Sequence, residues 1–267
     1  MPNFICVTCG TQFADTVEEP ESCPICEDER QYVGAQGQQW TTLDQLKKRH
    51  KNRIEKKETH LYGIGTEAKF AIGQRALLLQ LPHGNILWDC ISLLDDETAA
   101  WIDEMGGLAA IAISHPHYYS SVVEWAEAFN AQVYLHRADS QWVMRPHPAI
   151  QFWEGDQLKL HDNITLIRGG GHYDGGTVCH WPGGAAGKGA LLTGDIIQVV
   201  ADTRWVIFMY SYPNLIPLSA AKVSAIQRAV EPFDFDRIYG AWWERNVATD
   251  AQEVVRRSAE RYIKAIQ

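Results

Sequence analysis

Four cysteines near the N-terminus constrain the fold of this 267-residue chain more than any other feature. Cys6 and Cys9 form one C-x2-C pair, Cys23 and Cys26 form a second, and thirteen residues separate the two pairs. Each pair makes a tight knuckle that points two thiolates at one place, and two knuckles complete a tetrahedral metal site. So short a segment has too little apolar mass to fold without a staple. The spacing therefore predicts a zinc-ribbon-like module over residues 1–35, holding one structural zinc ion.

Charge limits what this module can bind. Zinc ribbons often bind nucleic acid, but residues 1–35 carry one arginine, Arg30, against seven acidic residues: Asp15, Glu18, Glu19, Glu21, Glu27, Asp28 and Glu29. Such a segment repels phosphates. We therefore predict a structural or protein-contacting module. Four thiolates accept iron as readily as zinc, so a rubredoxin-type iron centre is the alternative at this site.

The composition of the whole chain sets its class. The formal net charge of −9 disfavours a nucleic-acid partner, since that affinity comes largely from clustered Lys and Arg. No apolar run approaches the roughly 18 residues of a membrane span, and the first ten residues do not resemble a signal peptide. We expect a cytoplasmic protein with a small-molecule substrate and without membrane or nucleic-acid partners. The sequence leaves a homo-oligomer open.

The next segment is basic. In TTLDQLKKRHKNRIEKKE, residues 41–58, Thr42 followed by Gln45 is typical of a capping box, and the apolar residues fall near one helical stripe. Residues 36–58 are thus predicted to link the module to the body as a helix. From about residue 60 strand and helix patterns alternate, so residues 59–267 are predicted to form one body with a mixed sheet, or two sheets, flanked by helices.

Two histidines close an apolar strand in the stretch AISHPH. His115 and His117 lie at i and i+2 and project to the same side, where neighbouring neutral imidazoles are best satisfied by a cation. In IRGGGHYDGG, a glycine-rich loop after a strand carries His172. In LLTGDIIQ, an apolar strand carries Asp195 in its middle, where a carboxylate is costly unless paired or metal-bound. These four side chains are the predicted ligands of a second metal site.

The order of these segments resembles the metallo-β-lactamase superfamily over roughly residues 60–265. ILWDC resembles its strand-aspartate motif, SHPH its H-x-H opening, GGHYDGG its third histidine loop, LLTGD its bridging aspartate and FDRIYGAWW its final segment. The resemblance implies an α/β fold, an αββα sandwich of the metallo-β-lactamase type preceded here by a small zinc ribbon. It also implies a site at one edge, between two sheets.

The chain departs from the superfamily pattern at the second metal position. The full signature is H-x-H-x-D-H, and its aspartate and last histidine are Tyr119 and Ser120 here. The final segment, which usually supplies another histidine, offers Ala241, Trp242 and Trp243. The first metal position is complete. We therefore predict that the histidine site holds one ion.

A single zinc ion on three imidazoles keeps a fourth position for water, whose pKa it lowers to about 7. The main prediction is a mononuclear zinc hydrolase that cleaves a small-molecule ester, thioester, lactone or amide through a metal-bound hydroxide. Asp195 would complete the coordination shell or act as general base. Tyr118, Tyr119 or Asp174 would donate a proton to the leaving group, although the tyrosines equally suit a space-filling role. Asp89 is expected to brace a loop.

Two other functions stay open. A mononuclear Fe(II) oxygenase-type enzyme would use two of the histidines with Asp195, and persulfide dioxygenases of the superfamily use such a set. A catalytically degenerate binding or assembly protein would account for the lost ligands of the second position. Against degeneracy, the four remaining side chains would be a buried polar cost without a metal. Zinc is predicted at both sites, with iron as the alternative at either.

The segment that follows Asp195 is the expected wall of the substrate pocket. Residues 201–219 mix aromatic side chains, among them Trp205, Tyr210 and Tyr212, with Arg204. An aromatic wall favours an apolar substrate, and the arginine suits a carboxylate or phosphate. The alternative for most of these aromatic residues is a place in the core.

Overall fold

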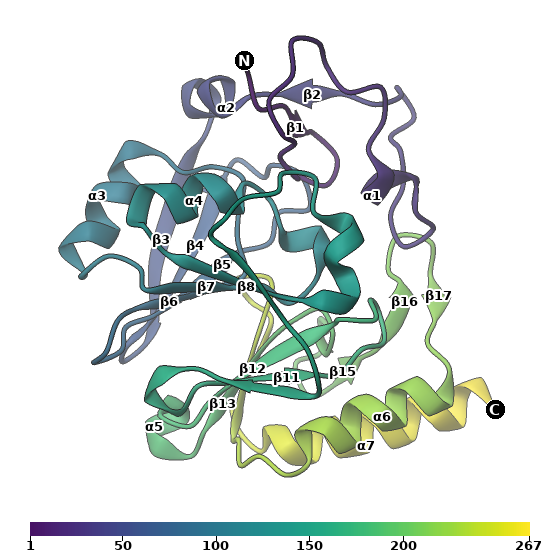
Figure 1. Ribbon diagram of the computed structural model, residues 1–267. Helices are drawn as coiled ribbons and strands as arrows, with labels where there is room; N and C mark the ends of the chain where they lie inside the picture. The colour runs from purple at the N-terminus through teal and green to yellow at the C-terminus, as the bar shows by residue number, and fades with distance from the viewer. The chain divides into compact units, whose positions relative to one another are not determined.

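The computed structural model describes residues 1–267, which form two compact units, each a mixed α/β arrangement (Figure 1). The first unit comprises Met1–Leu135 and Ser140–Phe152, and the second comprises His136–Asp139 and Trp153–Gln267. The predicted segments 1–35 and 36–58 both belong to the first unit. None of the helices combines the length and apolar character that a bilayer crossing requires.

The first unit is built on a seven-stranded sheet in the order β3-β4-β5-β6-β7-β8-β9. The strands from β3 to β6 pair antiparallel, whereas β6, β7 and β8 run parallel. The strands are β3 (Lys51–Glu58), β4 (Leu61–Glu67), β5 (Ala76–Leu79), β6 (Ile86–Trp88), β7 (Ala110–Ala112), β8 (Gln132–His136) and β9 (Ile150–Trp153). β5 and β6 form a hairpin around His83-Gly84-Asn85.

Helices make the two parallel crossovers of this sheet, as parallel pairing requires. α3 (Asp96–Glu104) connects β6 to β7, and α4 (Val122–Phe129) connects β7 to β8 (Figure 1). The Asp95 side chain caps α3 by accepting from the Thr98 amide at 2.8 Å. α4 ends at Asn130 in the left-handed conformation, a common helix stop.

The basic helix predicted over residues 41–58 is wrong in its second half. Helix α2 covers only Leu43–Arg49, with the Thr42 hydroxyl accepting from the Gln45 amide at the predicted N-cap. Residues 51–58 instead form β3, whose side chains alternate between half-buried and exposed over much of its length. Charged residues at every second position suit an edge strand as well as a helix, because both present one polar face. Pairing with β4 decides in favour of the strand.

The second unit is built on a six-stranded sheet in the order β10-β11-β12-β13-β18-β19, in which only β13 and β18 are parallel. Its strands are β10 (Gln157–Lys159), β11 (Thr165–Arg168), β12 (Thr177–Trp181), β13 (Ala190–Gly194), β18 (Arg237–Gly240) and β19 (Asn246–Val247). Two further hairpins pair β14 (Gln198–Val199) with β15 (Val206–Ile207) and β16 (Met209–Ser211) with β17 (Ile216–Pro217).

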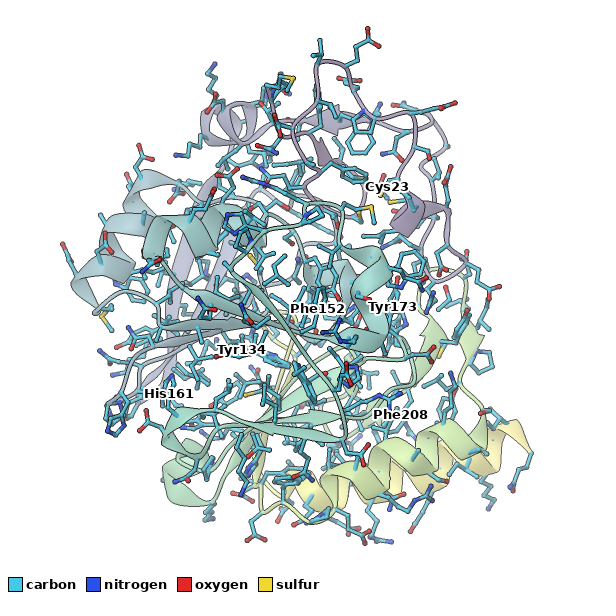
Figure 2. The ribbon with its side chains drawn as sticks, viewed as in Figure 1. Cys23, Tyr134, Phe152, His161, Tyr173 and Phe208 are labelled. Atoms are coloured by element: carbon cyan, nitrogen blue, oxygen red, sulfur yellow. The ribbon has the colours of Figure 1, made fainter.

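Two long amphipathic helices cover this unit. α6 (Ala220–Val230) and α7 (Ala251–Ile266) lie side by side, and their buried residues join the core of the β11, β13 and β18 strands (Figure 1). Phe208, labelled in Figure 2, is fully buried there and packs edge-on against Tyr262. Of the expected pocket wall, Phe208 is therefore a core residue.

Candidate metal centres

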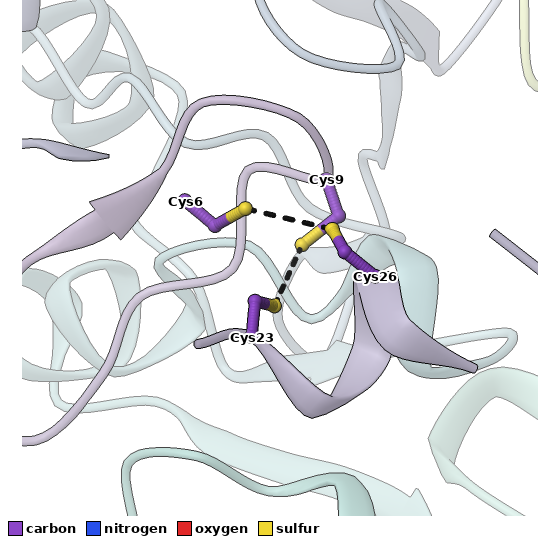
Figure 3. A group of neighbouring side chains, drawn as sticks. All are labelled: Cys6, Cys9, Cys23 and Cys26. Atoms are coloured by element: carbon purple, nitrogen blue, oxygen red, sulfur yellow. Dashed lines mark hydrogen bonds between the residues drawn. The ribbon is translucent and has the colours of Figure 1, made fainter. Parts of the chain in front are cut away.

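The four cysteines of the N-terminal module converge as predicted (Figure 3). The sulfur atoms of Cys6 and Cys26 are 3.6 Å apart, and those of Cys9 and Cys23 are 3.7 Å apart. Four sulfurs at about 2.3 Å from a central zinc ion are separated by about 3.8 Å in a tetrahedron. All four side chains are buried. The observed separations therefore fit a four-thiolate metal site.

Local structure explains why these thiols meet. The Gly10 amide donates to the Cys6 carbonyl at 2.8 Å, closing the first knuckle, and Gly10 has a φ of +83°, which favours glycine. The second knuckle opens a short helix, α1 (Pro24–Glu27), whose first residue needs no amide donor. Hydrogen bonds with Cys23 and Cys26, together with burial, raise the pKa of the Cys9 thiol well above its ordinary value. A bound cation must therefore displace protons.

The first unit supplies two histidines to the second candidate site. His115 and His117 flank the start of a 3-10 turn (Pro116–Tyr118) after β7, and both are buried. Their ring centroids are 5.1 Å apart. The His115 Nδ1 atom lies 2.9 Å from the Ser114 hydroxyl, which orients the ring. The i, i+2 spacing thus places both imidazoles in one buried region at the end of β7.

The second unit supplies His172, from the glycine-rich loop after β11. The side chain is buried, and its Nδ1 atom lies 2.6 Å from the backbone carbonyl of Tyr210. A carbonyl only accepts hydrogen bonds, so Nδ1 of the neutral ring must carry the proton and Nε2 the lone pair. This arrangement is the usual one for a metal-binding histidine, whose other nitrogen donates to a carbonyl or carboxylate.

Asp195 lies in the same unit, directly after β13 rather than in the middle of a strand as predicted. The strand ends at Gly194, whose φ of +54° turns the chain, and Asp195 is 5% exposed. The Tyr212 hydroxyl donates to the Asp195 backbone carbonyl at 2.6 Å, and the Tyr212 ring lies 5.5 Å from that of His172. Burial, followed by the nearby carboxylate charge, raises the pKa of Tyr212 well above 10.0. Tyr212 is therefore a neutral hydrogen-bond donor.

All four predicted ligands are buried and of residue types that bind metal ions: the first unit carries His115 and His117, and the second carries His172 and Asp195. No sequence pattern marks Ser114 and Tyr210, the two residues that orient His115 and His172. Ser114 precedes the H-x-H pair without any pattern that marks its role, and Tyr210 acts through a backbone carbonyl that any residue type could supply.

The predicted proton donors lie in different surroundings. Tyr118 is fully buried with its ring 4.4 Å from that of His115. Tyr119 lines a small cavity of about 20 Å³ shared with Thr11 and Gln12 of the N-terminal module. Asp174 is 75% exposed at the surface, 3.7 Å from the Lys222 ammonium. Their catalytic roles stay predictions.

The remaining residues of the expected pocket wall lie in two different surroundings. Tyr210 and Tyr212 adjoin His172, as described above. Trp205 lies beneath two guanidinium groups of α7, with Arg261 at 3.7 Å and Arg257 at 5.0 Å from the ring centroid. Arg204 is paired at 2.8 Å with Asp202. Neither Trp205 nor Arg204 is positioned by a contact with the metal ligands of this unit.

Gly171 immediately precedes His172, and its substitution should strain the loop. Gly170 and Gly171 both have positive φ, +65° and +88°. A Cβ at Gly171 would lie 2.7 Å from Ile226, whereas a Cβ at Gly170 would meet nothing closer than 3.6 Å. We expect Gly170→Ala to lower the free energy of unfolding by about 1 kcal/mol, from backbone strain alone. Gly171→Ala should cost about 3 kcal/mol, because overpacking adds to that strain. Urea unfolding of the two metal-free variants measures the difference, and equal losses would contradict it.

Asp89 makes stability depend on pH. Burial raises the pKa of Asp89 from 3.8 to about 7, despite an opposing hydrogen bond from the Ser114 amide at 2.8 Å. The folded state therefore holds this proton more tightly than the unfolded state. Protonated Asp89 therefore adds about 4 kcal/mol to the free energy of unfolding below pH 4, and this stabilisation is lost as the pH rises through about 7. Asp89→Asn keeps an acceptor for Ser114 and tolerates the φ of +60°. We expect the free energy of unfolding of the metal-free variant, measured with urea, to lack this decline with pH. Parallel pH profiles for the wild-type chain and the variant would refute the raised pKa of Asp89.

Comparison with known proteins decides the family. No protein-family model matches the chain. One relative, "Uncharacterized protein YmaE" of Bacillus subtilis (strain 168), is 54% identical over 268 residues, spanning 100% of this chain and 97% of the relative. The chain belongs to the YmaE family. The match covers the whole chain, so it includes the cysteine module.

Solved structures identify the fold. The DIM-1 metallo-β-lactamase superposes with a TM-score of 0.61 at 13% identity, covering 81% of this chain and 99% of the other. The FIM-1 metallo-β-lactamase from Pseudomonas aeruginosa, in its mono-zinc form, gives 0.58 at 13% identity, with coverages of 79% and 95%. SMB-1 in complex with mercaptoacetic acid gives 0.52 at 18%, covering 78% and 95%. The YmaE-family chain has the metallo-β-lactamase fold, as the sequence resemblance predicted.

Proposed function

We propose that the protein is a mononuclear metal-dependent hydrolase whose ion is held by His115, His117, His172 and Asp195. One observation carries the proposal. The Tyr210 carbonyl fixes the proton of His172 on Nδ1, so Nε2 carries the lone pair that a metal ion would accept. A buried imidazole prepared in this way suits a metal ion. Three imidazoles and a carboxylate are also a donor set that zinc accepts.

The prediction of a single ion is supported by Tyr119 and Ser120, which replace two ligands of the superfamily's second metal position. The Ser120 hydroxyl donates to the Cys90 carbonyl at 3.2 Å and accepts from the Gln74 amide at 3.1 Å, so it serves the interior of the first unit. Tyr119 lines a cavity beside the N-terminal module. Neither residue type is a good ligand for zinc in its ordinary neutral form. The FIM-1 structure was solved in its mono-zinc form, so one ion is compatible with the fold.

A zinc ion in this position would polarise a substrate carbonyl and lower the pKa of a bound water to about 7. The chain's own residues would do the rest. Ser114 and the Tyr210 carbonyl hold the rings of His115 and His172 in their orientations. The Tyr212 hydroxyl, held neutral by burial, donates to the backbone of Asp195, whose carboxylate would either complete the coordination of the ion or accept a proton from a water beside it.

Assays of the metal-reconstituted chain on small esters, thioesters, lactones and amides test the proposal. We expect hydrolysis of at least one class, at the same rate in air and under anaerobic conditions, with either zinc or iron bound. Turnover that consumes dioxygen would instead support an Fe(II) oxygenase built on the same two-histidine, one-carboxylate set. Absence of any bound ion at the histidines would support the degenerate, non-catalytic alternative.

A further inference from the structure

The turn that follows His117 is strained and needs external support. Ser120 has a φ of +46°, a left-handed conformation that side chains other than glycine adopt at a cost of about 1–3 kcal/mol. The residue is buried, and it stands three positions after His117 and directly before the turn into α4. Such strain persists only where the surroundings fix the conformation, so the contacts of Ser120 show what fixes it.

The cysteine module makes one of those contacts directly. The backbone N–H of Gln12 donates to the Ser120 carbonyl at 2.9 Å, and Gln12 is 3% exposed. A second path starts at Gly10, whose carbonyl accepts from the Ser92 hydroxyl at 2.7 Å. The Ser121 hydroxyl in turn donates to the Ser92 carbonyl at 2.8 Å. Two consecutive residues of the turn are thus tied to the segment that follows the Cys6-Cys9 knuckle.

The side chain of Gln12 extends the link to α4. Its amide donates to the Glu124 carboxylate at 3.0 Å, and the Arg145 guanidinium pairs with the same carboxylate at 2.6 Å while also bonding Gln12. Glu124 lies in the first turn of α4, which begins two residues after Ser120. Together these bonds hold the chain on the C-terminal side of the H-x-H pair.

Apolar packing fixes the module on the same unit. Ile5, next to the first cysteine, is fully buried in a cluster with Leu46 and Leu93. A Cβ at Gly10 would lie 2.6 Å from the Ser92 hydroxyl, so the knuckle sits in close contact with that segment. A cation held by the four thiolates would add its binding free energy to this packing and so stabilise the shape of the knuckle.

We propose that the metal ion of the four-cysteine module positions the H-x-H turn through the side chains of Gln12, bonded to Glu124, and Ser92, bonded to Gly10, and so raises the affinity of the histidine site for its own ion. This inference rests on the proposed function only in that the histidine site binds a metal. Coupling between two binding sites is reciprocal, so occupancy of the histidine site must raise the affinity of the cysteine site by the same factor. Gln12 and Ser92 are positioning residues in this scheme.

Cobalt(II) titration of the full chain tests the coupling, since thiolate-bound cobalt gives sulfur-to-metal charge-transfer absorption and the histidine-site ion does not. We expect Cys23→Ser/Cys26→Ser to lose the charge-transfer band and to bind cobalt at the histidines about tenfold more weakly. Gln12→Ala/Ser92→Ala keeps all four cysteines, so the band should remain while the affinity of the histidine site falls about threefold or more. Cys179→Ser, at a buried thiol of β12 outside the module, is the matched control and should change neither.

Unchanged histidine-site affinity in the Gln12→Ala/Ser92→Ala variant, confirmed as folded by circular dichroism, would overturn the inference. That variant decides the matter even if the double cysteine variant fails to fold. A wild-type chain that binds no second cobalt ion would instead contradict the proposed function. A wild-type chain that binds both ions and hydrolyses substrate, with no coupling between the sites, would leave the proposed function intact and remove only this inference.

Discussion

His172→Ala is expected to weaken metal binding at the histidine site by more than about 100-fold and to abolish hydrolysis. Loss of a hydrogen-bond partner behind a metal-binding histidine alone costs about 10–100-fold in metal affinity, and loss of the ligand itself must cost more. The variant should keep its fold, because His172 lies on a loop and the β11 and β12 strands that flank it pair with each other. Competition with a chromophoric chelator measures the affinity, and substrate turnover measures the activity.

His161→Ala is the matched control. His161, labelled in Figure 2, lies in the same unit and pairs only 3.0 Å from its neighbour Asp162, outside the ligand group. Its replacement should leave metal affinity and turnover within about twofold of the wild-type values, as surface substitutions usually do. Full activity in the His172→Ala variant would show that this histidine is not a ligand.

Cys9→Ser is expected to remove the metal ion of the N-terminal module and to unfold that module. Apparent binding free energies of structural zinc in small modules are about 10–16 kcal/mol, and this binding energy is folding energy. The cysteines themselves form the centre of the local core, against which Phe13, Trp40 and Trp142 pack. Loss of the ion should therefore expose this cluster, raise the protease sensitivity of residues 1–40 and lower the melting temperature.

Two comparisons separate loss of the metal from loss of a buried thiol. Cys179→Ser removes an equally buried thiol from β12 and should change neither the metal content nor the protease sensitivity. A strong chelator added to the wild-type chain should reproduce the effect of Cys9→Ser. A module that stays protease-resistant without metal would contradict the structural role of the ion.

Much of the fold was predictable because its signals are local. The spacing of the cysteine pairs, the glycine-rich loop before His172 and the strand before Asp195 each belong to one continuous stretch of sequence. The mixed α/β fold followed from alternating strand and helix patterns together with the resemblance of these motifs. The comparison with solved structures confirms that fold.

The errors arose where tertiary pairing overrides a local pattern. Residues 51–58 carry charges that suit a helix, but they form a strand because they pair antiparallel with β4. Gln12 and Ser92 show no signal in the sequence, because their roles depend on backbone groups from Gly10 and Ser120 that pattern analysis does not see. The carbonyl that orients His172 is hidden for the same reason.

The most direct test of the account is the number of metal ions per chain, measured by elemental analysis of the purified protein. We predict two ions in the wild-type chain and one in the His115→Ala/His172→Ala variant, with the remaining ion lost on replacement of Cys9. Three ions in the wild-type chain, or two in the double histidine variant, would contradict a single ion held by His115, His117, His172 and Asp195.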